Sequence, residues 1–252
     1  MPILFLSNIC FALHLTQWLN LCQIITMLRV LAKGTNFIFG NIFRKKGVFV
    51  SSSLAFLDRK RNIDKNYFDY IRLSTLELIG YEIGKKKLSG NVAELGVYKG
   101  KFARYINQYF PDRVLYLFDT FEGFDKRDVK SETDRNYSSG EQDFSDTSIE
   151  SVLKLMPFPE KCKPVKGFFP ESARNLDDHF VFVSLDADLY EPIYNGLHFF
   201  YPRLVTGGYI FIHDFNNDAY KGARKAVEQF SAELQINYLP LPDLGGSAII
   251  VK

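Results

Sequence analysis

The stretch FVFVSLDAD, residues 180–188, joins an unbroken apolar run to two aspartates. Consecutive apolar residues favour a strand that is buried on both faces, as in a parallel sheet covered by helices. Asp186 and Asp188 follow this run, and Glu191 comes soon after them. Open parallel sheets bind ligands beyond the carboxyl ends of their strands. Negative charge at this position therefore indicates either a binding site or a surface loop that caps the next helix.

Similar apolar runs alternate with helix-like segments on both sides of this stretch. We expect further strands at 91–97, 114–121, 164–169 and 209–215, helices at 66–87, 99–110, 191–204 and 219–234, and two short strands within 237–242 and 247–252. This alternation predicts an α/β fold of three layers, in which helices cover both faces of a mostly parallel sheet.

The composition is that of an ordinary globular protein. The chain has 252 residues, of which 46% are hydrophobic and 24% are charged, and its net charge is +2. No basic stripe interleaved with aromatic residues is present, so we expect no nucleic-acid partner. Cys10, Cys22 and Cys162 form no CxxC pair and no metal-binding spacing. Three such cysteines favour a reducing compartment, and we expect a cytoplasmic protein.

The first 28 residues contain no Asp, Glu, Lys or Arg. Their length suits a membrane span, but scattered polar residues such as Asn8, His14 and Gln17 disfavour it. A membrane anchor, a helix docked on a partner, and an over-long start before Met27 remain open, and membrane contact is not favoured. Residues 29–65 show no clear period and predict a linker. We therefore divide the chain into an apolar segment with its linker, 1–65, and a catalytic domain, 66–252.

The first predicted strand leads into ELGVYKG, residues 94–100. Gly96 permits a tight turn and a close backbone approach, and Gly100 opens a helix whose N-terminus carries partial positive charge. The dinucleotide pattern GxGxxG is absent. An acidic residue two positions before Gly96 suits a ligand with an amino group better than a pyrophosphate. A plain strand-to-helix turn explains the motif equally well.

The second predicted strand ends at Asp119, nineteen residues after Gly100. A carboxylate about 20 residues beyond a glycine turn can accept both hydroxyls of a ribose. An N-cap or turn aspartate is the alternative. Combined with the glycine turn, this spacing favours ribose binding without separating an adenosyl cofactor from NAD.

Polar residues also end the fifth predicted strand, where His213 and Asp214 follow an apolar run. Adjacent parallel strands would bring this pair next to Asp186. Two carboxylates and an imidazole form a site for a divalent cation, whose remaining positions water can fill. Two simpler roles stay open, because Asp188 can cap the helix after it and a single histidine such as His213 often only packs.

Five segments together resemble the macrocin/mycinamicin family of sugar O-methyltransferases. They are ELGVYKG, LFDTFEGF, KGFFPES, VSLDADLYEPIYNGLHFFYPRL and GGYIFIHDF, in this order. The resemblance runs from about Asn66 to Lys252. It implies the Rossmann-like sheet of class I methyltransferases with a C-terminal antiparallel strand, the cofactor S-adenosylmethionine, a magnesium ion, and a sugar or glycosylated small molecule as the acceptor.

The resemblance also implies a role for each matching residue. The methionine end of the cofactor would contact Glu94, Gly96, Val97, Tyr98 and Gly100. The ribose would contact Asp119, with Thr120 and Phe121 beside it, and the adenine would contact Gly167 and Phe168. Asp186 would contact the cofactor, ligate the metal and act as base, and Asp214 would be a second ligand. The family often has two acidic residues where this chain has His213-Asp214. His213 is therefore either a ligand of a softer metal, or a catalytic base, or a neighbour of a metal that Asp186, Asp214 and another oxygen hold.

The acidic segment 125–147 is interpreted as a solvated loop or as a lid over the acceptor, with Tyr67, Tyr70 and Arg72 as an opposite wall.

Two rival functions remain. A nicotinamide-dependent sugar dehydrogenase would require GxGxxG, and the Tyr81–Lys85 spacing precedes the first strand, where it serves no such site. A non-catalytic membrane-tethered scaffold would need neither the carboxylates nor the cofactor turn. An aromatic content of 15% is compatible with a homo-oligomer.

Overall fold

The computed structural model describes residues 27, 30–31, 33–35, 37–40, 42 and 69–252. The chain forms two compact units, Met1–Asn62 and Ile63–Lys252. The predicted boundary at 65/66 lies outside the described residues, and so do the predictions for 1–26. The described residues between 27 and 42 are helical. Those from residue 30 on fall in the stretch that the sequence predicts as a linker.

No helix among the described residues is long and apolar enough to cross a membrane.

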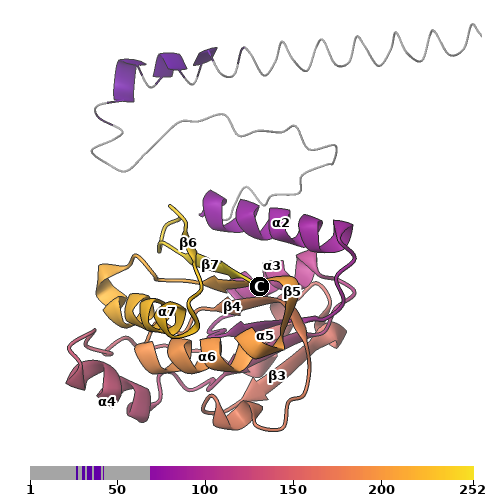
Figure 1. Ribbon diagram of the computed structural model, residues 1–252, viewed down its shortest axis with the longest axis vertical. Coiled ribbons are helices and arrows are strands. Elements are labelled where there is room, and N and C mark those ends of the chain that lie inside the picture. The colour runs from indigo at the N-terminus through magenta and orange to yellow at the C-terminus, as the bar shows by residue number, and fades with distance from the viewer. Residues whose placement is uncertain (1–26, 28–29, 32, 36, 41, 43–68) are drawn as a thin grey trace, which may run out of the picture. The chain divides into compact units, whose positions relative to one another are not determined.

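The second unit contains one seven-stranded sheet (Figure 1). Its strands are β1 (Asn91–Leu95), β2 (Leu115–Asp119), β3 (Cys162–Lys166), β4 (Phe180–Leu185), β5 (Leu204–Ile212), β6 (Leu239–Pro240) and β7 (Ala248–Val251). The strand order is β3-β2-β1-β4-β5-β7-β6. The pairs among β1 to β5 are parallel, and β7 runs antiparallel to both β5 and β6. The predicted α/β fold with its C-terminal antiparallel strand is confirmed.

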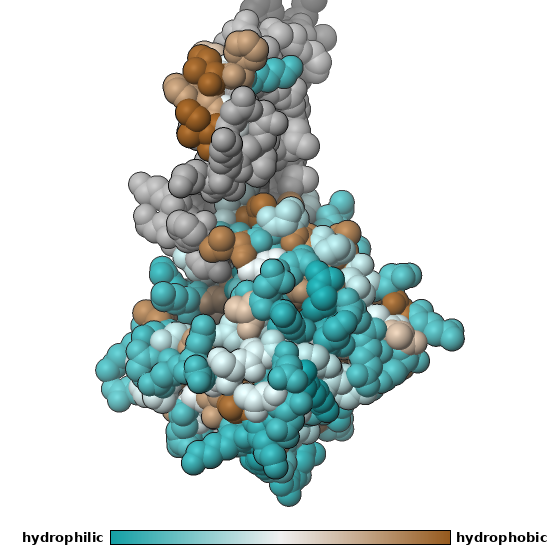
Figure 2. Space-filling view, turned by 90° about the vertical axis from the view of Figure 1, so that its left-hand side faces the viewer, coloured by the Kyte–Doolittle hydropathy of each residue, from teal (hydrophilic) through white to brown (hydrophobic). Residues whose placement is uncertain are grey.

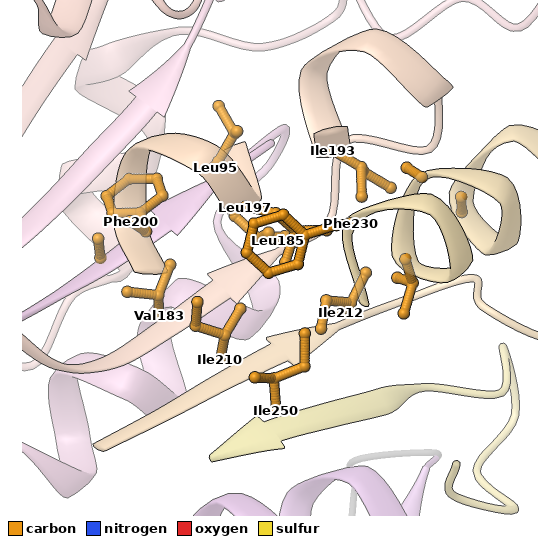
Figure 3. Packing of buried hydrophobic residues seen from close by; sticks show 14 of the residues in the cluster. Leu95, Val183, Leu185, Ile193, Leu197, Phe200, Ile210, Ile212, Phe230 and Ile250 are labelled. Carbon is orange, nitrogen blue, oxygen red and sulfur yellow. The ribbon is translucent and has the colours of Figure 1, made fainter. Parts of the chain in front are cut away.

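Helices cover both faces of this sheet. They are α2 (Tyr70–Lys85), α3 (Lys101–Tyr109), α4 (Lys126–Asp134), α5 (Ile149–Leu155), α6 (Tyr190–Arg203) and α7 (Lys221–Leu234). Alternate residues of each strand point to opposite faces and separate the core into two clusters. One cluster packs against α6 and α7, where Leu185 and Ile212 of the sheet meet Leu197 and Phe230 (Figure 3). The other packs against α2, α3 and α5.

The segment 125–147 contains a helix that the solvated-loop interpretation did not include. Asp125 caps α4 by accepting a hydrogen bond from the Arg127 amide, and Glu132 within the helix is completely buried. The Glu132 carboxylate accepts a hydrogen bond from the Tyr190 amide at the start of α6, 2.9 Å away, and one from Gly222 at the start of α7. A buried carboxylate between two helix N-termini explains why so polar a sequence packs onto the domain.

Candidate active site

A pocket of about 360 Å³ opens at the carboxyl edge of β1, β2, β4 and β5. Eleven of the thirteen predicted site residues line it: Glu94, Gly96, Val97, Tyr98, Asp119, Thr120, Gly167, Phe168, Asp186, His213 and Asp214. Gly100 instead precedes α3 with a φ of 72°, and the Phe121 side chain lies in the core cluster beside α3. The fold therefore brings most of the predicted residues to one cavity.

The turn after β1 passes unusually close to the end of β4. Gly96 has a φ of 85°, and a Cβ atom at this position would lie 2.2 Å from the Asp186 carbonyl oxygen. The Gly96 amide donates to the Phe118 carbonyl at 2.9 Å, which fixes the turn against β2 as well. Only glycine combines this conformation with this approach.

Asp119 at the end of β2 organises two loops at once. Its Oδ2 accepts hydrogen bonds from the amides of Val97 at 2.7 Å and Tyr98 at 2.9 Å. Its Oδ1 accepts one from the Phe121 amide at 2.6 Å. A carboxylate has about four lone-pair sites, so acceptor capacity remains for a ligand hydroxyl.

Glu94 brings a buried carboxyl group to the floor of the pocket. It is 1% exposed, and its Oε2 has no hydrogen-bond partner among the described residues. Burial, followed by the nearby charges of Asp186 and Asp119, raises the pKa of Glu94 well above its usual value. A buried acceptor without a partner is costly, so this oxygen suits a ligand that carries an amino group or a positive charge.

Asp186 forms an ion-paired group with residues from two other elements. Its Oδ2 accepts from Arg72 of α2 at 2.8 Å, and its Oδ1 lies 3.0 Å from Nδ1 of His213. Burial alone would raise the pKa of Asp186, but the charges of Arg72 and His213 hold it well below the usual range. Asp186 is therefore a carboxylate at neutral pH.

Asp188 and Asp214 complete the acidic edge. Asp214 accepts from Nδ2 of Asn217 at 2.7 Å through Oδ1, and its Oδ2 lies 2.8 Å from Nδ1 of His213. Burial, followed by the charges of Asp214 and Asp186, raises the pKa of Asp188 well above its usual value. Asp188 does not cap α6, because the residue at the N-cap position is Leu189 and the first amide of the helix, that of Tyr190, donates to Glu132 instead.

His213 lies between two carboxylates and a glycine. A Cβ atom on Gly245 would lie 2.4 Å from Cε1 and 2.5 Å from Nε2 of the His213 ring, so the turn before β7 leaves only the space that the ring fills. Burial alone would lower the pKa of His213, but the Asp186 charge and the hydrogen bonds that the ring donates to Asp186 and Asp214 raise it to about 10. His213 is therefore protonated at neutral pH when no cation is bound.

The donor set of this edge fits a divalent cation. Asp186, His213 and Asp214 each offer one ligand atom, and these atoms all lie within 4.8 Å of one another. Carboxylate oxygens suit hard cations such as Mg²⁺ and Mn²⁺, and of these two Mn²⁺ binds an imidazole nitrogen more readily. Any cation would have to replace the proton that now links His213 to both carboxylates.

The end of the 125–147 segment borders the pocket. Phe144 lines the cavity and packs edge-to-face on Tyr98, with ring centroids 4.9 Å apart. The Tyr98 hydroxyl donates to Asp146 at 2.6 Å, and the Tyr220 hydroxyl donates to Gln142. The segment thus contacts both the turn after β1 and the start of α7, as a wall or lid would.

Sequence reasoning missed the roles of Arg72 and Asp128, which are among the charged residues that line this pocket. It placed Arg72 on a wall but not in an ion pair with Asp186, which lies 114 positions away. Asp128 of α4 also lines the pocket, where burial, followed by the charges of Asp125 and Glu191, raises its pKa to about 7. In the sequence, Asp128 is marked only by Asp125, which lies three positions earlier and caps the helix that carries it.

We expect the stability of the metal-free protein to fall between about pH 6 and about pH 10. The His213 pKa rises from 6.5 to about 10 on folding, so its stabilisation is complete below 6.5 and is lost as the pH rises through 10. Urea titrations with a chelator, at both ends of this window, measure the effect. The difference in the free energy of unfolding between the wild type and His213→Gln should be smaller at the higher pH, by roughly several kcal/mol. A difference that does not change with pH would contradict the assignment.

A parallel sheet with this strand order, an antiparallel β7 and a pocket at its carboxyl edge define a class I methyltransferase fold. The family model of macrocin-O-methyltransferase (TylF) matches residues 64–249, and the chain belongs to this family. The protein is therefore an S-adenosylmethionine-dependent O-methyltransferase. No curated protein sequence matches the chain significantly.

Solved structures agree with this fold. The O-methyltransferase NovP is 20% identical, with a TM-score of 0.58 over 72% of this chain and 79% of NovP. The calicheamicin methyltransferase CalS11 is 20% identical, with a TM-score of 0.58 over 71% and 78%. A putative caffeoyl-CoA O-methyltransferase from Staphylococcus aureus is 14% identical, with a TM-score of 0.51 over 91% and 99%.

Proposed function

We propose that this protein methylates a hydroxyl group of a sugar or a glycosylated small molecule with the help of a divalent cation. The observation that supports the cation most directly is the cluster of Asp186, His213 and Asp214 in the pocket that Glu94 and Asp119 also line. The sugar acceptor is supported by the family and by CalS11, which is described as a TDP-rhamnose 3′-O-methyltransferase.

The cofactor would occupy the β1–β2 side of the pocket. The unpartnered Oε2 of Glu94 would accept a hydrogen bond from its amino group, and the turn at Gly96 would allow the methionine part to approach the backbone. Asp119 would accept a hydrogen bond from the ribose, and Gly167 and Phe168, which line the pocket, would contact the adenine. Gly100 and Phe121 would support these loops without touching the cofactor.

A cation at the opposite side would be held by Asp186, Asp214 and either His213 or the neighbouring Asp188. When bound, it would lower the pKa of an acceptor hydroxyl and fix its direction. Mg²⁺ is expected from the family resemblance, whereas the imidazole of His213 favours Mn²⁺.

The reaction itself needs alignment and the removal of one proton. The acceptor oxygen forms a bond to the methyl carbon as the bond to sulfur breaks, which leaves S-adenosylhomocysteine. The pocket walls would hold the two reactants in line. Asp186 would take the hydroxyl proton, because its carboxylate lines the pocket at the edge where the cation would hold the acceptor.

Calorimetry with S-adenosylhomocysteine and with NAD, each with and without Mg²⁺ or Mn²⁺, tests the proposal. We expect S-adenosylhomocysteine to bind and NAD not to bind. Turnover of a panel of nucleotide-linked sugars and glycosides should then stop on addition of EDTA and return with added cation. Failure to bind S-adenosylhomocysteine would overturn the cofactor assignment. Turnover that is insensitive to EDTA would overturn the proposed role of the metal but not the cofactor assignment.

A further inference from the structure

Charge is divided sharply between the two units of the chain. Residues 1–62 contain eight Lys or Arg and one Asp, a net charge of +7. Residues 63–252 contain 23 Lys or Arg and 28 Asp or Glu, a net charge of −5. The small overall charge of +2 therefore conceals a basic first unit, and such asymmetry is typical of chains that bind nucleic acid or membranes.

The first unit also exposes apolar side chains. Among its described helical residues, Met27, Val30, Leu31, Ile38 and Ile42 are 56–68% exposed. Their spacings of three, four and eleven residues place them on one face of a helix. In Figure 2 the coloured atoms of this unit are mostly brown, whereas the visible face of the second unit is mostly teal.

Basic residues flank this apolar face. Lys33 lies within the helical stretch, the cluster Arg44-Lys45-Lys46 follows it, and Arg59-Lys60-Arg61 comes next. The uncharged residues 1–28 precede it. A nucleic acid would use the basic residues and leave the apolar ones in water. An anionic lipid surface would use both, because headgroups attract the cations and the acyl boundary accepts the apolar face.

We propose that residues 1–62 bind this enzyme to the surface of an anionic lipid bilayer. The apolar face of residues 27–42 enters the headgroup boundary, and the basic clusters contact acidic headgroups. Binding to lipid is separate from the proposed sugar methylation, and either can fail without the other.

Flotation of the full chain with vesicles tests the proposal. We expect binding to vesicles of phosphatidylcholine with about a third phosphatidylglycerol, much weaker binding to phosphatidylcholine alone, and weakening by salt. Changing Arg44, Lys45 and Lys46 to Gln should lower the affinity roughly a hundredfold, because each cation contributes about fivefold. The matched control changes the exposed triplet Lys85-Lys86-Lys87 of the second unit to Gln and should leave binding unchanged.

The apolar contribution needs its own pair of variants. Ile38→Asp should reduce binding at least about tenfold, since it places a charge on the inserted face. Leu155→Asp changes a 45% exposed leucine of the second unit and should have no effect. Equal binding to neutral and anionic vesicles, or no binding to either, would overturn the proposal. Self-association of the wild type that Ile38→Asp abolishes, without lipid binding, would instead assign this face to a second copy of the chain.

Discussion

Asp186→Asn should lower turnover about a thousandfold, while the affinity for S-adenosylhomocysteine changes less than about threefold. The substitution keeps the size of the side chain but removes the charge that pairs with Arg72 and lies 3.0 Å from His213. It therefore removes the proposed base and one metal ligand together. Single-turnover rates and calorimetry measure the two quantities separately.

Two controls accompany this prediction. Asp177→Asn removes an exposed carboxylate outside the pocket and should keep full turnover. Thermal unfolding shows whether the uncompensated charge of Arg72 has destabilised the fold. Turnover close to that of the wild type would contradict the role of Asp186 in the reaction. Loss of turnover together with loss of S-adenosylhomocysteine binding would show that its role is structural.

Gly96→Ala should destabilise the domain by roughly 3–5 kcal/mol and abolish cofactor binding. The added Cβ atom would lie 2.2 Å from the Asp186 carbonyl oxygen, in backbone that cannot yield without moving the end of β4. A φ of 85° adds strain for any residue with a side chain. Denaturant unfolding and calorimetry measure both effects.

The matched control is Gly84→Ala in α2. A Cβ atom there would meet nothing within 4 Å, so alanine should stabilise the helix by about 0.5–1 kcal/mol. Equal stability of the Gly96→Ala and Gly84→Ala variants would contradict the close approach of the two strand ends.

The strands were predictable from their continuous apolar runs, and most helices from the spacing of their apolar residues. The apolar run at 180–185 lies at the centre of the sheet as β4, where Phe180, Val183 and Leu185 belong to one core cluster and Val181 and Phe182 to the other. The residues that follow neighbouring strands were predicted to lie close together, because parallel strands end at the same edge of the sheet. This rule placed Asp186 beside His213 although 27 positions separate them.

Residues that act through contacts distant in the sequence were not predictable in this way. The pairing of Arg72 with Asp186 depends on how α2 crosses the sheet, which no local pattern encodes. Helix α4 is stabilised by Glu132, whose partners at the starts of α6 and α7 lie far along the chain. The helical residues between 27 and 42 were missed because Phe37 and Phe39 lie off the face that the other apolar residues form and so obscure its period.

The packing of Gly245 against His213 has a consequence for how this site can vary between relatives. Gly245 leaves no room for a side chain while the imidazole is present, and two carboxylates hold that ring in place. A change at position 245 therefore requires a smaller or differently placed residue at position 213. Positions 213 and 245 should vary together in evolution, and a histidine at 213 should be inherited with a glycine at 245.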